Sequence, residues 1–368
     1  SSDLKLKFVI NYYKGHMNHM AFIFEGDKMN LDRLKTLCSC CGVSSNEQDI
    51  AEIMKPAFEE NADQIVRDNL GSIFAYKKSK RENAKTFMIA CPMDECGMMV
   101  SKVNDNGTLT FITLEDIAVS SLLHQRVTIL CRDHSMITGV ITNRKNVLEG
   151  GSEAKSLNDL VIDCGYTDKT DLMVLPGDLV SYASNFFVEN NIVYAKALNP
   201  RVLNEVCMEV VENLKEHELD FNLAIGAMSQ STIGFRGTKT ATYTIQPDAA
   251  LALCVFDNGK PNAKLNGGVV VGMYDKGMIP SQRLINDFKG FTSANGYFGM
   301  IGNDSSFIHK TVKGCPTVAV GIACGNTGSA NEMVAVNDID ALVHTLTDYI
   351  LHLNNEMITD FGFGEHHV

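Results

Sequence analysis

Five short stretches of the chain carry polar or thiol side chains at the ends of the strands that the sequence predicts. They are residues 91–95, 197–201, 230–232, 254–257 and 324–329. The apolar run at residues 221–228, which precedes Ser231 and Thr232, is typical of a buried strand in a parallel sheet. Because ligands bind at the carboxyl ends of such strands, the sequence predicts one crevice to which all five stretches contribute.

Three kinds of chemistry are compatible with these side chains. Cys91 or Cys254 could be a nucleophile, but nothing in the sequence places His309 beside either thiol as a base. Ser231 could be a serine nucleophile, although the chain lacks the Gly-x-Ser-x-Gly elbow. Thiolates are also good zinc donors, and a site of this kind could be built from Cys91, Cys96, Cys254 and Asp257.

The elements that must position these stretches follow an α/β pattern. Apolar runs at residues 86–90, 249–256, 268–273 and 316–323 predict further buried strands like the one before Ser231. Apolar residues at helical spacing predict helices near residues 31–37, 48–58, 202–214 and 342–353.

The pattern changes to short strands between residues 97 and 194. Residues 100–112 alternate around Asn106-Gly107, which is the strongest short signal for a β-hairpin. Further strands are predicted at residues 126–131, 137–142, 160–164 and 178–182, separated by turn residues at near-regular spacing, as in a small β-barrel.

These patterns predict an α/β fold interrupted by an inserted β-barrel. We expect an N-terminal extension at residues 1–28, an α/β domain formed by residues 29–97 and 195–368, and the inserted barrel at residues 98–194. His16 and His19 in the extension could suggest metal, but two histidines in a terminal loop are more simply incidental.

Composition excludes several classes of function. The formal net charge of -12 argues against a nucleic-acid or anionic-membrane partner. No apolar run approaches the roughly 20 residues that span a bilayer. The 11 cysteines have no spacing framework, which favours a reducing cytoplasm over a disulfide scaffold.

Five sequence motifs together resemble a known family. They are Met-Asp-Glu-Cys-Gly at residues 93–97, Lys-Ala-Leu at 196–198, Ile-Gly-Phe-Arg-Gly at 233–237, Asp-Lys-Gly-Met-Ile at 275–279 and Gly-Asn-Asp at 302–304. Their order around an inserted β-domain is similar to the metallo-aminopeptidases that build tetrahedral dodecamers, the glutamyl and deblocking aminopeptidase family. The resemblance extends from about residue 31 to residue 341 and implies a three-layer, zinc-peptidase-like α/β domain.

The resemblance also implies a two-zinc or two-cobalt site with five protein ligands and a glutamate base. This chain departs from the family at every one of those positions. The two ligand histidines, the bridging aspartate, the ligand glutamate and the ligand aspartate are replaced by Pro92, Gly328, Asn199, Thr232 and Cys254, respectively. Ser231 occupies the position of the general-base glutamate.

These replacements remove the chemistry that the family uses. A divalent pair needs several anionic or imidazole donors, whereas only Cys254 among the five could supply an anionic ligand. Ser231 cannot take a proton from water as a carboxylate does. Structural interpretations also exist: Asn199 followed by proline is a good N-cap, Cys254 is a small buried hydrophobe, and Gly328 serves loop geometry.

Some residues near the expected crevice match the family. Asp94, which in the family orients a ligand histidine, and Asp304 are retained, and we hypothesise that they bind a cationic group such as a peptide amino terminus. Arg201, Arg236 and His309 also match, and we interpret them as residues that maintain the fold.

The sequence therefore predicts a cytoplasmic pseudo-peptidase that keeps the aminopeptidase fold without its metals, so that no zinc or cobalt cofactor is expected. Its role would be binding or scaffolding, with a peptide or amino acid as ligand. The resemblance implies a homo-oligomer between a dimer and a dodecamer, with barrel contacts in the dimer, and co-assembly with an active relative. Two alternatives are an enzyme that reuses the pocket for other chemistry and a residual metal-dependent aminopeptidase.

Overall fold

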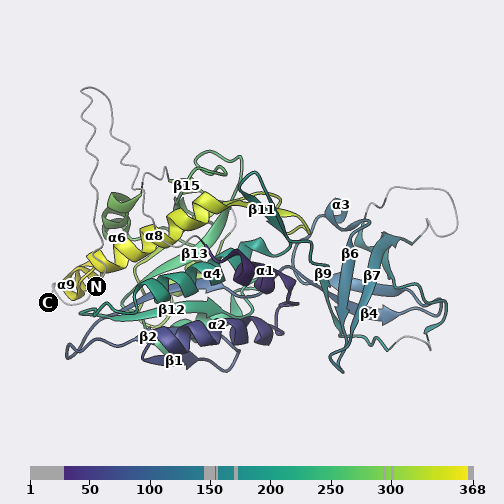
Figure 1. Cartoon of the computed structure of the whole chain (residues 1–368), viewed down its shortest axis with the longest axis horizontal. Helices are drawn as coiled ribbons and strands as arrows, with labels where there is room; N and C mark the ends of the chain where they lie inside the picture. The colour runs from purple at the N-terminus through teal and green to yellow at the C-terminus, as the bar shows by residue number, and fades with distance from the viewer. Residues whose placement is uncertain are drawn as a thin grey trace, which may run out of the picture.

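The computed structural model describes residues 29–144, 154, 156–169, 173–292, 296–299 and 302–363. Figure 1 shows two parts side by side, a layered α/β part and a barrel joined to one of its ends. The predicted N-terminal extension, with His16 and His19, lies outside the described residues.

A mixed sheet of eight strands forms the centre of the α/β part. In spatial order the strands are β1 (Gln64–Arg67), β2 (Ile73–Lys77), β12 (Asn222–Met228), β3 (Thr86–Pro92), β13 (Ala249–Asp257), β16 (Thr317–Cys324), β14 (Val270–Tyr274) and β15 (Tyr297–Phe298). Strands β12, β3, β13 and β16 are parallel, as expected. Strand β14 runs antiparallel to β16, so the run at residues 268–273 is a strand but not another parallel one.

Helices cover both faces of this sheet because its buried strands are apolar on both sides. Along β3, Phe87 and Ile89 pack into the larger core, while Met88 and Ala90 pack into a smaller core on the opposite face. The helices around the larger core are α1 (Leu31–Ser39), α2 (Gln48–Asn61), α4 (Leu198–Asn213), α6 (Gln282–Phe288), α8 (Val336–His352) and α9 (Asn355–Phe361). The smaller core is covered by α5 (Arg236–Ile245) and α7 (Ser305–Ile308).

The inserted part is a closed barrel with its own apolar core. Its strands, in order around the barrel, are β4 (Met98–Val103), β5 (Leu109–Thr113), β8 (Leu160–Asp163), β7 (Met136–Asn143), β6 (Arg126–Leu130) and β9 (Leu179–Tyr182). The short elements α3 (Val119–Leu122) and η1 (Leu157–Asp159) connect them. The hairpin predicted around Asn106-Gly107 is the β4–β5 pair. The predicted fold class, α/β with an inserted β-barrel, is confirmed.

A small sheet leads the chain from the barrel back to the α/β part. It pairs β10 (Phe187–Glu189), β11 (Ile192–Ala195) and β17 (Glu332–Ala335), all antiparallel. After β11, Ala197 takes a left-handed conformation with φ of 59° and acts as the N-cap of α4. The prediction that Asn199 caps this helix is therefore wrong, since the helix already begins at Leu198.

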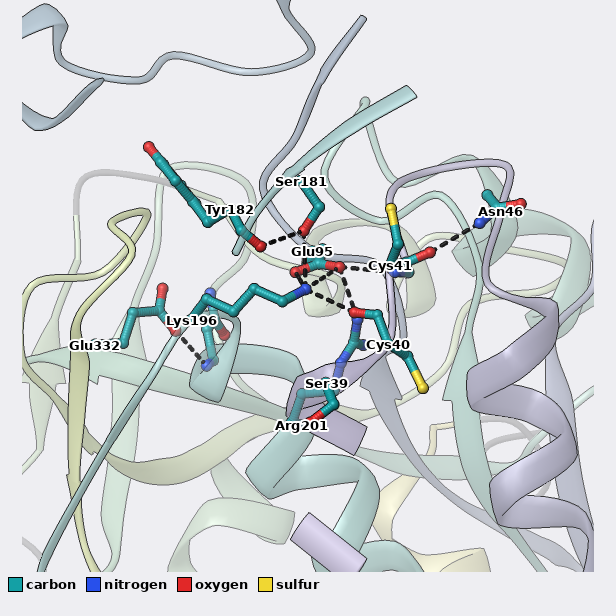
Figure 2. Close-up of polar contacts among 12 residues, drawn as sticks. Ser39, Cys40, Cys41, Asn46, Glu95, Ser181, Tyr182, Lys196, Arg201 and Glu332 are labelled. Carbon is teal, nitrogen blue, oxygen red and sulfur yellow. Dashed lines mark hydrogen bonds and ion pairs between the residues drawn. The ribbon is translucent and has the colours of Figure 1, made fainter. Parts of the chain in front are cut away.

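A buried ion pair fastens the two parts where the chain passes between them (Figure 2). Lys196, which follows β11, donates from Nζ to both oxygens of Glu95 at 2.8 and 2.7 Å. The same ammonium group donates to Ser181 Oγ of barrel strand β9 at 2.8 Å and to the carbonyl oxygen of Cys40 at 2.6 Å. Arg201 adds a second cation, with Nη2 3.4 Å from Glu95 Oε1. All four side chains from Glu95, Ser181, Lys196 and Arg201 are buried.

Within the described residues, no helix has both the length and the apolar character that a membrane crossing requires.

Candidate functional site

The loop after β12 is folded tightly back on itself. Backbone hydrogen bonds join Arg236 N–H to Gln230 O and Gly237 N–H to Ser229 O, both at 3.1 Å. Gln230 reverses the chain with a φ of 51°. A Cβ at Gly237 would lie 2.1 Å from the Ser229 carbonyl oxygen, so only glycine fits at this position. The closure of this loop directs Ser231 and Thr232 toward the inside of the site.

Asp94 is the centre of a compact hydrogen-bond cluster beside this loop. Its Oδ1 accepts from Ser231 N–H at 2.8 Å, and its Oδ2 accepts from Thr232 N–H at 3.1 Å and from Thr232 Oγ1 at 2.5 Å. The hydroxyl of Ser44 also donates to Oδ2. Burial raises the pKa of Asp94, whereas these hydrogen bonds act in the opposite direction. The two positions at which the family resemblance implies glutamates thus both donate to a retained aspartate.

Asp304 forms a second buried acceptor on the other side of Ser231. Its Oδ1 accepts from Ser231 Oγ at 3.0 Å and from the hydroxyl of Thr238. Burial raises the pKa of Asp304 to about 6, because desolvation outweighs the two hydroxyl donors. Ser231 is therefore held between two carboxylates, to Asp94 by its N–H group and to Asp304 by its hydroxyl group.

A cavity of about 540 Å³ opens in front of this loop. Of the predicted site residues, the structure brings seven together in its lining: Pro92, Asn199, Ser231, Thr232, Cys254, Asp257 and Asp304. Gly328 is not part of the lining, although its neighbour Thr327 is. Asp94 is also outside the lining and lies behind Ser231 and Thr232. The strand-end prediction therefore located the cavity.

Glu332 connects two of the altered positions. Its Oε2 accepts from Asn199 N–H and its Oε1 accepts from Gly328 N–H, both at 2.7 Å. Burial raises the pKa of Glu332 to about 7. Gly328 has a φ of 77°, which confirms that loop geometry favours glycine at this position. Glu332 is thus occupied with the backbone and does not point into the cavity as a free carboxylate.

The residues at the ligand positions do not fit a pair of divalent metals. Pro92 and Gly328 have no side-chain donor, and the hydroxyl of Thr232 donates to Asp94. Burial raises the pKa of the Cys254 thiol far above its ordinary value, so the thiolate is disfavoured. Among the described residues, no group of three or more His, Cys, Asp or Glu side chains is arranged to hold a metal ion.

The residues of the cysteine-based alternatives lie apart. Cys91 is buried in the core, with its Sγ 3.7 Å from Cys207 Sγ. His309 Nδ1 is 2.9 Å from the carbonyl oxygen of Ser305, and the imidazole lines a different cavity of about 770 Å³. Neither Cys91 nor Cys254 therefore has the histidine partner that a cysteine nucleophile would need.

Sequence reasoning missed much of the cavity wall. Glu115, from the segment after barrel strand β5, reaches the lining, as does Lys260 beyond β13. Five aromatic side chains also contribute, and only Phe256 among them lies in a predicted stretch; the others are Phe235, Tyr274, Tyr297 and Phe298. Two of them, Tyr297 and Phe298, are adjacent in the sequence between Gly296 and Gly299, and this pattern alone does not indicate a cavity. Glu115 carried no signal in the sequence because only the docking of the barrel brings it to the cavity.

Comparison with known proteins gives one matching family model. Residues 71–344 match the model described as M42 glutamyl aminopeptidase. The chain is 29% identical over 335 residues to a putative aminopeptidase of Acetivibrio thermocellus, an alignment that covers 87% of this chain and 98% of that protein. It is 27% identical over 349 residues to the glutamyl aminopeptidase of Lactococcus lactis subsp. cremoris, covering 89% of this chain and 98% of the relative.

Solved structures give the same result for the fold. The TET aminopeptidase of a marine-sediment archaeon of the Thaumarchaeota superposes with a TM-score of 0.84 at 28% identity, covering 90% of this chain and 98% of that one. A TET peptidase of Pyrococcus horikoshii, described as assembling into a tetrahedron or a large octahedral shell, superposes with a TM-score of 0.79 at 23% identity. That match covers 88% of this chain and 99% of the other.

Proposed function

The chain belongs to the M42 glutamyl aminopeptidase family. From this premise we propose that it binds ligands in the cavity in front of Ser231 and Thr232 and does not catalyse metal-dependent hydrolysis. The proposal concerns the chemistry of the site, since the fold is that of the family. It retains the cavity as the functional site and assigns it a binding role.

One observation carries the proposal: the hydroxyl group of Thr232 donates a hydrogen bond to Asp94, and that of Ser231 donates one to Asp304. A metal pair needs acceptors that face it, and a hydrolytic water needs a base that faces it. At these two positions the side chains instead satisfy buried carboxylates. Asp94 accepts hydrogen bonds from four donors. These donors stabilise its buried carboxylate without a metal cation.

We also propose that the protein works as a homo-oligomer. The support comes from its relatives, among which one solved structure is a dodecamer and another forms a tetrahedral or octahedral shell. The size of the particle, from dimer to dodecamer, would be measured by light scattering. Co-assembly with an active relative would show as mixed particles in native mass spectrometry after the two purified proteins are refolded together.

The proposal about the site is tested by metal content and turnover. Purified protein is dialysed against zinc, cobalt or manganese, passed through a desalting column and analysed for metal, and the same samples are assayed with aminoacyl-p-nitroanilides of acidic, basic and apolar residues. We expect no stoichiometric metal and no turnover. Stoichiometric metal with turnover would overturn the proposal, while stoichiometric metal without turnover would replace it with a rebuilt metal site.

A further inference from the structure

A second cavity, of about 770 Å³, lies at the opposite edge of the central sheet from Ser231 and Thr232. Its lining includes Lys85, Asp248 and Pro316, which come directly before the parallel strands β3, β13 and β16. Helices α6 and α9 also reach it, and Figure 1 shows both at the end of the α/β part away from the barrel. The cavity in front of Ser231 lies at the other ends of these strands, and the two cavities share no lining residue.

The two cavities also have opposite charge. Cationic side chains of Lys85, Arg283 and Lys313 line the second cavity, against one carboxylate among its described lining residues, that of Asp248. The first cavity has four carboxylates in its described lining and the ammonium group of Lys260. The whole chain carries 44 Asp and Glu residues against 32 Lys and Arg residues, so an excess of positive charge in a cavity is unusual for it. Such an excess attracts an anion.

Two ammonium groups converge on one oxygen atom in the second cavity. Lys85 Nζ and Lys313 Nζ lie 3.5 and 3.7 Å from Asp248 Oδ1. Both distances are longer than the roughly 2.8 Å of a charge-assisted hydrogen bond. Asp248 Oδ2 accepts from Thr86 N–H at 3.0 Å, which holds the carboxylate at the start of β3. One carboxylate thus faces two ammonium groups, and an additional anion bound beside them would compensate the remaining positive charge.

Arg283 adds a third positive charge beside an apolar wall. Its Nη1 donates to the carbonyl oxygens of Asp360 and Gly362 at 2.7 and 3.2 Å, and its guanidinium group lies 5.1 Å from the ring centroid of Phe363. Carbonyl groups and aromatic rings stabilise a guanidinium group without cancelling its charge. Phe363 and Ile279 are 78% and 73% exposed, although both line the cavity. Large exposed apolar side chains at a cavity are typical of a surface that a ligand covers.

We propose that the second cavity binds a small organic carboxylate with an apolar body. The carboxylate group accepts hydrogen bonds from Lys85 and Lys313, and the carbon skeleton packs against Phe363 and Ile279. The volume of about 770 Å³ lies within the range of cavities that hold small organic ligands. The proposal goes beyond the proposed function and does not rest on it, because the second cavity shares no residue with the cavity in front of Ser231.

Isothermal titration of the full chain tests the charge requirement. The probes are 4-phenylbutyrate and its neutral counterpart 4-phenyl-1-butanol, with N-acetylphenylalanine as a mimic of a peptide carboxyl terminus and inorganic phosphate as an anion without an apolar body. We expect both carboxylates to bind, and to bind more weakly as the NaCl concentration rises. Tighter binding of N-acetylphenylalanine would identify a peptide terminus as the source of the carboxylate, and tighter binding of 4-phenylbutyrate would identify a free acid.

Three outcomes of the titration would overturn the proposal. The first is that neither carboxylate binds. The second is that 4-phenyl-1-butanol binds as tightly as 4-phenylbutyrate, which would show that the charge is not recognised. The third is that inorganic phosphate binds as tightly as 4-phenylbutyrate, which would show that the apolar wall contributes nothing.

Variants then locate the binding site. Lys313→Met removes an exposed ammonium group from the lining and should weaken binding of 4-phenylbutyrate about fivefold. Ile279→Ser removes apolar contact area and should weaken it about threefold. Lys310→Met is the matched control, because Lys310 is exposed in the same segment, lies 4.2 Å over the Phe307 ring and is absent from the lining. Thermal unfolding of each variant shows whether it is folded.

Unchanged affinity in folded Lys313→Met would contradict the assignment. An equal loss in Lys310→Met would contradict it too, because the effect would then come from the net charge of the chain rather than from a contact in the cavity. The result is separable from the metal and turnover experiment, which concerns the other cavity. Metal with turnover would overturn the proposed function and leave the carboxylate site in place, whereas failure of both carboxylates to bind would overturn only the carboxylate site.

Discussion

Thr232 Oγ1 lies 2.5 Å from Asp94 Oδ2 and donates a hydrogen bond to it. The contact joins a position at which the family resemblance implies a metal ligand to the aspartate that would orient another ligand. A hydroxyl group at this position satisfies the buried carboxylate, whereas a second carboxylate would need a cation between the two. The contact therefore favours a neutral side chain at position 232 beside the carboxylate of Asp94. Substitution of Thr232 tests this preference.

Thr232→Glu should destabilise the protein by about 2 kcal/mol or more at pH 8, since it adds a like charge beside buried Asp94 and removes a donor to it. Thr232→Gln is the control, because it has the same size without the charge. Urea unfolding at pH 8 and pH 5 measures both variants, and the glutamate variant should recover at pH 5. Equal stability of the two variants at pH 8 would argue against this account of the site.

Lys196→Met should cost about 3 kcal/mol of unfolding free energy, because it leaves buried Glu95 with the longer Arg201 contact as its ion pair and the Gly42 N–H as its remaining hydrogen-bond donor. Lys169→Met removes an exposed ion pair to Asp105 and should cost less than about 1 kcal/mol. Equilibrium unfolding in urea compares the two. Similar losses of unfolding free energy in both variants would mean that the buried pair stabilises the protein no more than the exposed pair does.

Stability should fall as the pH rises from about 4 to about 7. Burial raises the pKa of Asp304 to about 6 and those of Glu205 and Glu332 to about 7, above their unfolded values. The folded state therefore binds more protons than the unfolded state in this window, so deprotonation favours unfolding. One pKa unit corresponds to about 1.4 kcal/mol. Urea unfolding at pH 5, 6, 7 and 8 should show the decline, and Asp304→Asn should make it shallower. A stability that increases from pH 5 to pH 8 would refute this prediction.

Gly328→Ala should destabilise the protein by about 1 kcal/mol through backbone strain alone. The residue has a φ of 77°, and an added Cβ would meet only Cys96 Sγ, at an ordinary contact distance of 3.7 Å. Gly290→Ala is the control, since Gly290 is exposed, has no left-handed φ and has open space around it. Chemical denaturation should show loss in the first variant and little change or a gain in the second. The same strain would oppose a histidine ligand at position 328.

The sequence predicted the parts of the fold that depend on local patterns. Strand β3 and the β4–β5 hairpin follow from apolar runs and from Asn106-Gly107, and the cavity follows from where those runs end. The direction of β14 was not predictable in this way, because a buried strand has the same apolar pattern whether it runs parallel or antiparallel to its neighbour.

The loss of the metal site stays a prediction from the family resemblance, whereas the contacts of the residues at those positions are seen only in the structure. A missing carboxylate is visible in the sequence at Ser231 and Thr232, but their new acceptors are set by three-dimensional packing. The start of α4 was misplaced because Ala197, a residue that rarely adopts a left-handed conformation, supplies the cap in place of Asn199. Glu115 was overlooked because only the docking of the barrel brings it into the cavity lining.

The contact between Lys196 and Ser181 also has a consequence for how the molecule comes apart. Glu95 lies where the chain leaves for the barrel, Lys196 lies where it returns, and Ser181 belongs to the barrel itself, so one ammonium group bridges all three. Opening the junction on either side would leave a buried charge without its partner. The two parts should therefore melt as one cooperative unit in calorimetry, and a barrel excised between residues 97 and 195 would leave Lys196 and Glu95 on the remainder without the barrel's hydroxyl group.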